Sequence, residues 1–257
     1  MKRKVDFRFV STFLRFTSVL SALRCVALCR QPLLLLYHYI TKNPFHSDFI
    51  AFHFRTPTGL VKLKAFSPDD VVTLFIVFCR KEYSPQKSAR IFADFGSNIG
   101  ISAAYFLSRN HANFVYCYEP NRVNIERLGD NLKAFEGRYH LEEVCVGVES
   151  ATVSFGIEET GVYGSIGLGQ EGGKTFRVQC LHVNDILSKI LAERSMVDFL
   201  KIDIEGLEKD VIRTIRPEFL TRIRQIQAET GEFDYQIPGF SKTQFGSIVR
   251  YRLTGTA

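Results

Sequence analysis

Apolar and polar positions follow a regular order along the second half of the chain. Five short apolar runs are typical of buried strands: 91–95, 114–119, 139–147, 197–205 and 223–228. Between them, apolar residues recur at helical spacing, as in 125–135, 184–193 and 207–215. Strands that alternate with helices predict an α/β fold with a mostly parallel sheet and helices on both of its faces.

Further elements flank this core. Residues 49–65 predict a β-hairpin, and Pro68 opens a helix that extends to about Arg80. Residues 152–155 and 175–178 predict two paired strands around a glycine-rich segment, which is either a flexible connection or a lid on the substrate side. Residues 241–253 predict a last helix.

The first strand and the helix after it contain the first candidate ligand-binding residues. The strand ends in Asp94, and a turn with Gly96 and Gly100 leads into the helix, as at the opening of a nucleotide-type site. Glycine at both positions lets a ligand approach the backbone closely. The dinucleotide pattern G-x-G-x-x-G does not fit, because Asn98 and Ile101 occupy its second and third glycine positions.

An acid followed by this turn suits a ligand without phosphates, and S-adenosylmethionine is such a ligand. A second acid should then end the next strand and bind the ribose hydroxyls, and Glu119 stands there, nineteen residues after Gly100. Taken singly, the turn is also explained as a helix cap, and Glu119 as a surface acid. Both motifs together, at βαβ spacing, favour the cofactor.

The positive charge of the chain is concentrated at its N-terminus. The chain has 257 residues and a net charge of +6, while residues 1–42 hold eight Lys or Arg and one Asp. This segment therefore contributes +7 and the rest of the chain −1. A nearly neutral body has no basic footprint for nucleic acid, so no nucleic-acid partner is expected.

The basic N-terminal segment has two interpretations. It contains no uncharged run near the roughly 20 residues that span a bilayer. It predicts either a basic helix in peripheral contact with an anionic membrane, or a helix packed on the catalytic body. We expect three parts: a basic apolar arm at 1–45, a hairpin-and-helix lead-in at 46–89 and a catalytic domain at 90–257.

The cysteines point to an intracellular setting. The six of them lack C-x-x-C spacing, and Cys117 and Cys145 lie in apolar strand candidates. Reduced and buried thiols are typical of a cytoplasmic protein. We therefore expect a cytoplasmic location, with peripheral membrane contact as an addition.

Three longer motifs stand at the ends of the predicted strands: Asp94-Phe95-Gly96-Ser97-Asn98-Ile99-Gly100, Tyr118-Glu119-Pro120 and Phe199-Leu200-Lys201-Ile202-Asp203-Ile204-Glu205-Gly206. Together they resemble the FkbM family of S-adenosylmethionine-dependent methyltransferases, over about residues 50–230. The resemblance implies a class I, Rossmann-like methyltransferase fold. It also implies O-methylation of a hydroxyl on a sugar or secondary metabolite, so the acceptor would be a small molecule or a glycan.

The resemblance assigns roles residue by residue. It gives seven cofactor-binding residues: Asp94, Gly96, Asn98 and Gly100 around the methionine part, Glu119 at the ribose, and Val146 and Gly147 near the adenine. Asp203 and Glu205 would face the methyl group and the acceptor.

A general base would assist methyl transfer, because a sugar hydroxyl is a poor nucleophile. Asp203 is the first candidate and Glu205 the second, although Glu205 is equally well explained as stabilising the N-terminus of the helix after Gly206. With Glu229 these acids could hold a divalent cation. The resemblance does not require one, so no metal site is predicted.

The chain departs from the family in two places. Members often carry a His two residues after the acid that ends the fifth strand, where this chain has Gly231. The fold normally ends with two antiparallel strands after a further helix, and with 241–253 as that helix the final hairpin would be truncated. The fifth strand would then be an open edge at which the chain could self-associate.

Two other classes of function are alternatives. A nicotinamide-dependent oxidoreductase conflicts with the glycine spacing. A degenerate methyltransferase fold that serves as a membrane-associated interaction module agrees with missing C-terminal strands and a basic arm. The intact cofactor acids argue against this second alternative.

Overall fold

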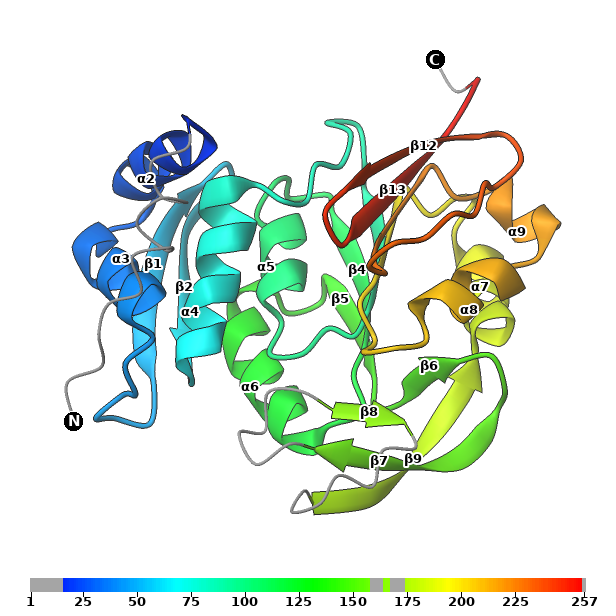
Figure 1. Cartoon of the computed structure of the whole chain (residues 1–257), viewed down its shortest axis with the longest axis horizontal. Helices are drawn as coiled ribbons and strands as arrows, with labels where there is room; N and C mark the ends of the chain where they lie inside the picture. The colour runs from blue at the N-terminus through cyan, green and yellow to red at the C-terminus, as the bar shows by residue number, and fades with distance from the viewer. Residues whose placement is uncertain (1–15, 158–163, 167–173, 256–257) are drawn as a thin grey trace.

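A seven-stranded sheet organises the molecule (Figure 1). The computed structural model describes residues 16–157, 164–166 and 174–255. The strands of the sheet are β3 (Ile91–Phe95), β4 (Phe114–Tyr118), β5 (Tyr139–Glu142), β10 (Phe199–Ile202), β11 (Gln225–Glu229), β12 (Phe240–Phe245) and β13 (Ile248–Leu253). Their order is β12-β13-β11-β10-β3-β4-β5, and the five strands from β11 to β5 run parallel.

Helices cover both faces of this sheet. They are α5 (Ile101–Leu107) and α6 (Arg122–Leu132), with its 3-10 extension η2 (Lys133–Phe135), on one face, and α7 (Val183–Glu193), α8 (Glu208–Thr214) and α9 (Pro217–Leu220) on the other. Successive strand residues point to opposite faces. Phe92 and Phe199 accordingly belong to the core beneath α5 and α6, and Ala93 and Leu200 to the core beneath α7 and α8. The predicted α/β fold is confirmed.

The C-terminal segment forms a hairpin, so the helix expected at 241–253 is wrong. β13 pairs antiparallel with both β11 and β12. The physical reason is a period-two pattern, in which Val249 and Tyr251 are fully buried and Arg252 is exposed. Gly246, at φ 59°, makes the tight turn. The hairpin is present, β11 is not an open edge, and the self-association expected there loses its basis.

An N-terminal layer lies outside α5 and α6 (Figure 1). It consists of α2 (Phe16–Leu28), α3 (Pro32–Thr41), the hairpin β1 (Ile50–Thr56) and β2 (Gly59–Ala65), α4 (Pro68–Leu74) and its π-helical continuation η1 (Phe75–Arg80). α2 packs on η1, and α3 packs on α4. The predicted hairpin and the helix after it are both present. The N-terminal segment, where it is described, packs on the body as two helices, because Pro32 starts a new one.

Residues 139–147 form two strands, although one was expected. β5 ends at Glu142, and β6 (Cys145–Gly147) joins a second, smaller sheet. The other strands of that sheet are β7 (Ala151–Ile157), β8 (Gly164–Ile166) and β9 (Lys174–His182). The predicted pairing of β7 with β9 is confirmed. Most of the glycine-rich segment, 158–163 and 167–173, lies outside the described residues.

Asn131 on α6 joins the N-terminal layer to the catalytic body. Its Nδ2 donates to the carbonyls of Ile99, at 2.9 Å, and Lys64, at 3.2 Å, and its Oδ1 accepts from the Lys64 backbone N–H at 2.7 Å. One buried amide therefore holds both β2 and the glycine turn. Within the described part of the chain, no helix has the length and apolar character needed to cross a membrane.

Candidate active site

The glycine turn after β3 brings the backbone close to the end of β10. Gly96 has φ 78°, and a Cβ placed on it would lie 1.8 Å from the Asp203 carbonyl oxygen. Only glycine fits such an approach. Gly100, at φ 81°, precedes the first residue of α5, and Asn98 takes the left-handed conformation at φ 47°. Asparagine tolerates this conformation better than most residues do.

Asp94 lies behind the turn and pairs with a lysine that the sequence analysis gave no role. Its Oδ1 is 3.0 Å from Lys201 Nζ, and its Oδ2 accepts from Ser102 Oγ at 2.5 Å. Lys201 Nζ also donates to the Gly96 carbonyl at 2.8 Å and lies 3.5 Å from Asp203 Oδ2. Burial alone would lower the pKa of Lys201, but Asp94 and Asp203 outweigh it and hold that pKa above its usual value. The lysine is therefore charged.

Glu119, after β4, is buried and holds the turn from the other side. Its Oε2 accepts from the Asn98 N–H at 2.9 Å, and its Oε1 accepts from the Asn121 N–H at 3.0 Å and from Asn124 Nδ2 at 3.4 Å. Burial raises the pKa of Glu119, and these hydrogen bonds oppose the shift. A carboxylate has about four acceptor positions, so Glu119 keeps capacity for a ligand hydroxyl.

The loop after β10 is shaped by Glu208, which the sequence analysis also missed. Its carboxylate accepts from the backbone N–H groups of Ile204, at 2.9 Å, and Gly206, at 3.0 Å. These bonds fix Glu205 at φ 60°, a strained conformation for a non-glycine residue. Glu208 thus shapes the loop in front of α8 and also places a carboxylate in the first turn of that helix.

Glu205 titrates near neutral pH. Burial raises its pKa first, and the negative charges of Asp203, Glu208 and Glu229 raise it further, to about 7, although Lys201 opposes them. A carboxyl group with such a pKa is suited to general acid–base catalysis.

A pocket joins several of these groups. It encloses about 650 Å³, including its opening to solvent. Six predicted site residues line it: Gly96, Asn98, Glu119, Val146, Asp203 and Glu205. Three others lie behind it. Asp94 faces Lys201, Gly100 packs against Leu128, and Gly147 packs against Cys180. We call this space the cofactor pocket.

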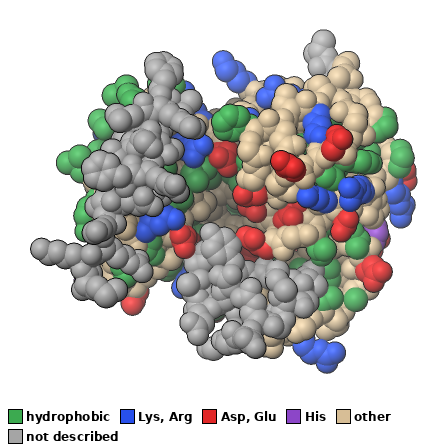
Figure 2. Space-filling model, in the orientation of Figure 1, with side chains coloured by type: hydrophobic (Ala, Val, Ile, Leu, Met, Phe, Trp, Pro, Cys, Tyr) green, Lys and Arg blue, Asp and Glu red, His purple; other side chains and the backbone are tan. Residues whose placement is uncertain are grey.

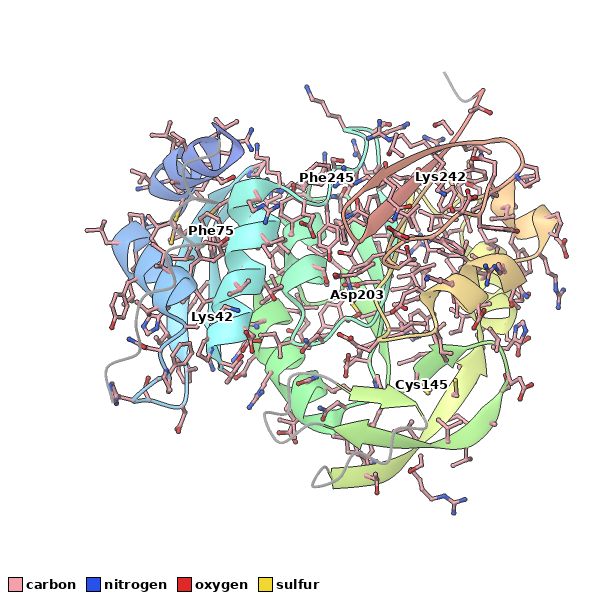
Figure 3. All side chains as sticks on the ribbon, viewed as in Figure 1. Lys42, Phe75, Cys145, Asp203, Lys242 and Phe245 are labelled. Carbon is pink, nitrogen blue, oxygen red and sulfur yellow. The ribbon has the colours of Figure 1, made fainter. Side chains whose placement is uncertain are left out.

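A second pocket opens beside the first. The two share Gly96, Asn98, Asp203 and Glu205. Its other wall comes from the N-terminal layer, through Lys42 after α3 and Asp69 and Thr73 on α4. Figure 3 labels Lys42 on this layer and Asp203 at the sheet, and in Figure 2 acidic side chains border the hollow at the centre of the view. We call this space the acceptor pocket.

The acids of the two pockets were considered above as ligands of a divalent cation. Among residues 16–157, 164–166 and 174–255, no group of three or more His, Cys, Asp or Glu side chains is arranged to hold a metal ion. The cation considered at Asp203, Glu205 and Glu229 therefore finds no support in the geometry.

The cofactor pocket suits S-adenosylmethionine. Glu119 can accept a ribose hydroxyl, and Val144 and Val146 supply an apolar wall for a purine. Asp203 and Glu205 offer negative charge to the sulfonium and ammonium groups. Among the described residues that line the pocket, none is a Lys or Arg.

Comparison with solved structures finds methyltransferases. One from Geobacter sulfurreducens is 16% identical, with 65% of this chain and 73% of that chain covered and a TM-score of 0.39. The N-terminal domain of human METTL16, in complex with SAH, is 12% identical, with 93% and 83% covered and a TM-score of 0.38. M. capricolum TrmK, also in complex with SAH, is 11% identical, with 65% and 63% covered and a TM-score of 0.33. No curated protein matches the chain significantly.

A family model gives the assignment. The model of the methyltransferase FkbM domain matches residues 94–252, which is well over half of the chain. The match includes the glycine turn, Glu119, the loop after β10 and the C-terminal hairpin. The alternative of an oxidoreductase is thereby wrong, and the C-terminal hairpin whose absence favoured a degenerate interaction module is present. The chain belongs to the FkbM family of methyltransferases, whose cofactor is S-adenosylmethionine.

Proposed function

We propose that the protein transfers the methyl group of S-adenosylmethionine to a hydroxyl oxygen of a small molecule or glycan, such as a sugar or a secondary metabolite. The observation that carries this proposal is the meeting of the two pockets at Asp203 and Glu205. The cofactor supplies a methyl group on a sulfonium, and an oxygen in the acceptor pocket would approach it in line.

Within this proposal, Asp203 and Glu205 face the acceptor hydroxyl. Both residues line the two pockets, but Asp203 is already engaged with Lys201, whereas Glu205 has a pKa of about 7. Glu205 is therefore the better general base near neutral pH, and Asp203 orients the hydroxyl. Glu119 binds the ribose, and Asn98 and Gly96 line the methionine part.

The charge of the acceptor pocket supports an acceptor other than nucleic acid. The described residues of its walls include five acids and two lysines: Asp69, Asp70, Asp203, Glu205 and Glu229, with Lys42 and Lys201. Such a wall repels a phosphate backbone, which nucleic-acid enzymes attract with Lys and Arg. A polyhydroxylated acceptor can donate hydrogen bonds to these carboxylates.

The proposal also includes the cellular location of the enzyme and its contact with a membrane. We place the protein in the cytoplasm because the six cysteines are unpaired and buried. The basic segment 1–42 adds a peripheral membrane contact.

The test is methyl transfer from labelled S-adenosylmethionine to a panel of sugars, glycosylated metabolites and RNA. We expect a hydroxylated small molecule or glycan to gain one methyl group on oxygen, as mass spectrometry would show. Transfer to RNA alone would contradict the proposal. Binding of the cofactor without transfer to any member of a broad panel would limit the protein to cofactor binding.

A further inference from the structure

The outer side of α2 and α3 is apolar, which is unusual for a helical layer that covers a core. Of the twelve large apolar side chains that are exposed in the described residues, eight lie on these two helices: Val19, Leu20, Leu23, Val26, Leu33, Leu34, Tyr37 and Ile40. The other four are scattered over the rest of the molecule. We call the eight side chains the outer face. Figure 2 shows green side chains along the edge of the molecule where these helices lie.

The inner side of the same helices is already occupied. Cys25, Cys29 and Leu35 are almost completely buried in the core of the N-terminal layer. A helix that is apolar all round normally lies inside a protein or in a membrane. Within the described part of the chain the outer face therefore has no partner, and a gathered apolar patch of this kind marks an interaction site.

A basic pocket is the second observation. It lies at the start of β3, and four cations line it without any acid: Lys81, Lys87, Arg90 and Arg109. In the part of the chain that the structure describes, none of the four lies within ion-pair distance of a carboxylate. The pocket thus offers side-chain cations without ion-pair partners to an anion.

The basic pocket is built around fixed groups. The guanidinium of Arg109 lies 4.5 Å from the ring centre of Tyr105, and its buried Nε has no hydrogen-bond partner among the described residues. Burial and the nearby charges of Arg24 and Arg109 lower the pKa of Lys81. α2 packs on η1, and Lys81 follows η1 directly, so the basic pocket adjoins the helix that carries half of the outer face.

The N-terminal segment matches the charge of an anionic surface. No acidic residue occurs between Asp6 and Asp48, and residues 1–42 carry +7. Arg55 on β1 donates to the Ala27 carbonyl at 3.2 Å and so adds a further cation beside α2. Apolar side chains bordered by cations are typical of a protein that lies on an anionic bilayer.

We propose that the outer face and the basic pocket form one docking surface for an anionic phospholipid membrane, with the lipid phosphate in the basic pocket. This inference rests on the proposed function and deepens it, because it states that the enzyme binds its acceptor at a membrane surface. α3 begins in the outer face and ends beside Lys42 of the acceptor pocket, and its ten residues span about 15 Å. An acceptor at the membrane surface would lie within reach.

The test uses the full chain and vesicles of phosphatidylcholine, with or without phosphatidylserine. We expect co-sedimentation with the mixed vesicles, which weakens as salt is raised. Leu23→Glu with Val26→Glu should abolish binding. Lys81→Gln with Lys87→Gln should weaken it about fivefold per lysine, as about 1 kcal/mol per basic residue requires. Equal binding to neutral vesicles, or wild-type binding by both double variants, would overturn the proposal.

Matched controls separate this surface from general effects. Phe245→Glu removes a side chain that is 80% exposed on the C-terminal hairpin, and Lys133→Gln removes an exposed cation beside α6; both should bind vesicles like the wild type. Circular dichroism would confirm that every variant is folded. Glu119→Gln should bind the cofactor more weakly and the vesicles as the wild type does, so a failure of the proposed function and a failure of docking are distinguishable.

Two results would assign the surface to another occupant. If titration with inorganic phosphate gives binding that Lys81→Gln with Lys87→Gln removes, while no vesicles are bound, the basic pocket serves a free anion. If sedimentation velocity shows a dimer that Leu23→Glu dissociates, and vesicles are again not bound, a second copy covers the outer face. Either result overturns the membrane proposal.

Discussion

The ammonium of Lys201 lies 3.0 Å from a carboxylate oxygen of Asp94, and both side chains are almost fully buried. The two residues are direct partners in the register of β10 and β3. The lysine also holds the carbonyl of Gly96 and so ties the glycine turn to the neighbouring strand. The turn is therefore positioned by a charge pair within the sheet as well as by its own glycines.

Removing one member of this pair should be costly. Lys201→Met leaves Asp94 buried without its partner, and we expect the free energy of unfolding to fall by about 3–5 kcal/mol. The double variant with Asp94→Asn removes both charges and should recover a large part of the loss. Urea unfolding of the two single variants and the double variant measures this coupling. Additive losses would show that the two charges do not depend on each other.

Glu119→Gln should weaken the binding of S-adenosylmethionine. The amide must turn its NH₂ toward one of the backbone donors that the carboxylate now accepts, at Asn98 or Asn121, and it loses the charge-assisted bond to the ribose. One such bond is worth about 1.5–3 kcal/mol, so affinity should fall roughly ten- to hundredfold. Isothermal titration gives the value, with Glu136→Gln on the exposed surface as the control. Unchanged affinity would remove Glu119 from the site.

The pH dependence should identify the general base. With a pKa of about 7, Glu205 is protonated and inactive as a base in more acidic solution. The pH dependence of kcat/KM for the cofactor reports the pKa values of the free enzyme. This ratio should rise with pH up to about 7 and be constant above it. The pH at which kcat stops rising should be lower, because the positively charged cofactor stabilises the Glu205 carboxylate and so lowers its pKa in the complex. Glu205→Gln should remove this rise with pH and lower turnover by about 10²–10⁴-fold. If Asp203→Asn does this and Glu205→Gln does not, the roles are exchanged.

Glu208→Ala should act on turnover through the loop. It removes the acceptor for the N–H groups of Ile204 and Gly206, and the strained conformation of Glu205 then loses its support. We expect kcat to fall while the affinity for S-adenosylmethionine changes little. Glu208→Gln keeps one acceptor oxygen and should restore part of kcat, whereas Glu218→Ala on α9 should have no effect. Loss of cofactor affinity equal to the loss of kcat would contradict a role limited to positioning.

Local patterns predicted the strand–turn–helix units well. The run that ends in Asp94 and the one that ends in Glu119 each combine an apolar strand with turn chemistry, and both signals are contiguous in sequence. The roles of Lys201 and Glu208 were missed because they depend on register and on loop shape. Lys201 meets Asp94 only because β10 and β3 are neighbours. A lysine inside an apolar run was the available signal.

The C-terminal hairpin was missed although its pattern is present. Val249, Tyr251 and Leu253 alternate with arginines, which is a strand period, and Gly246 marks the turn. The apolar outer face of α2 and α3 was hidden for a different reason. The break at Pro32 rotates the second helix relative to the first, so a single helical projection over the whole segment mixes inner and outer positions.

The hydrogen bonds of Asn131 bear on how far this chain can be shortened. The stretch that matches the family model begins at Asp94, inside β3, yet two of the three bonds of Asn131 go to Lys64, which lies before it. Phe52 and Leu63 fill the same core as Phe106 and Leu128. A fragment that begins at Asp94 would keep the three sequence motifs. It would expose to solvent the core residues that now pack against the N-terminal layer. The stretch that matches the family model is thus smaller than the part of the chain that packs around this core.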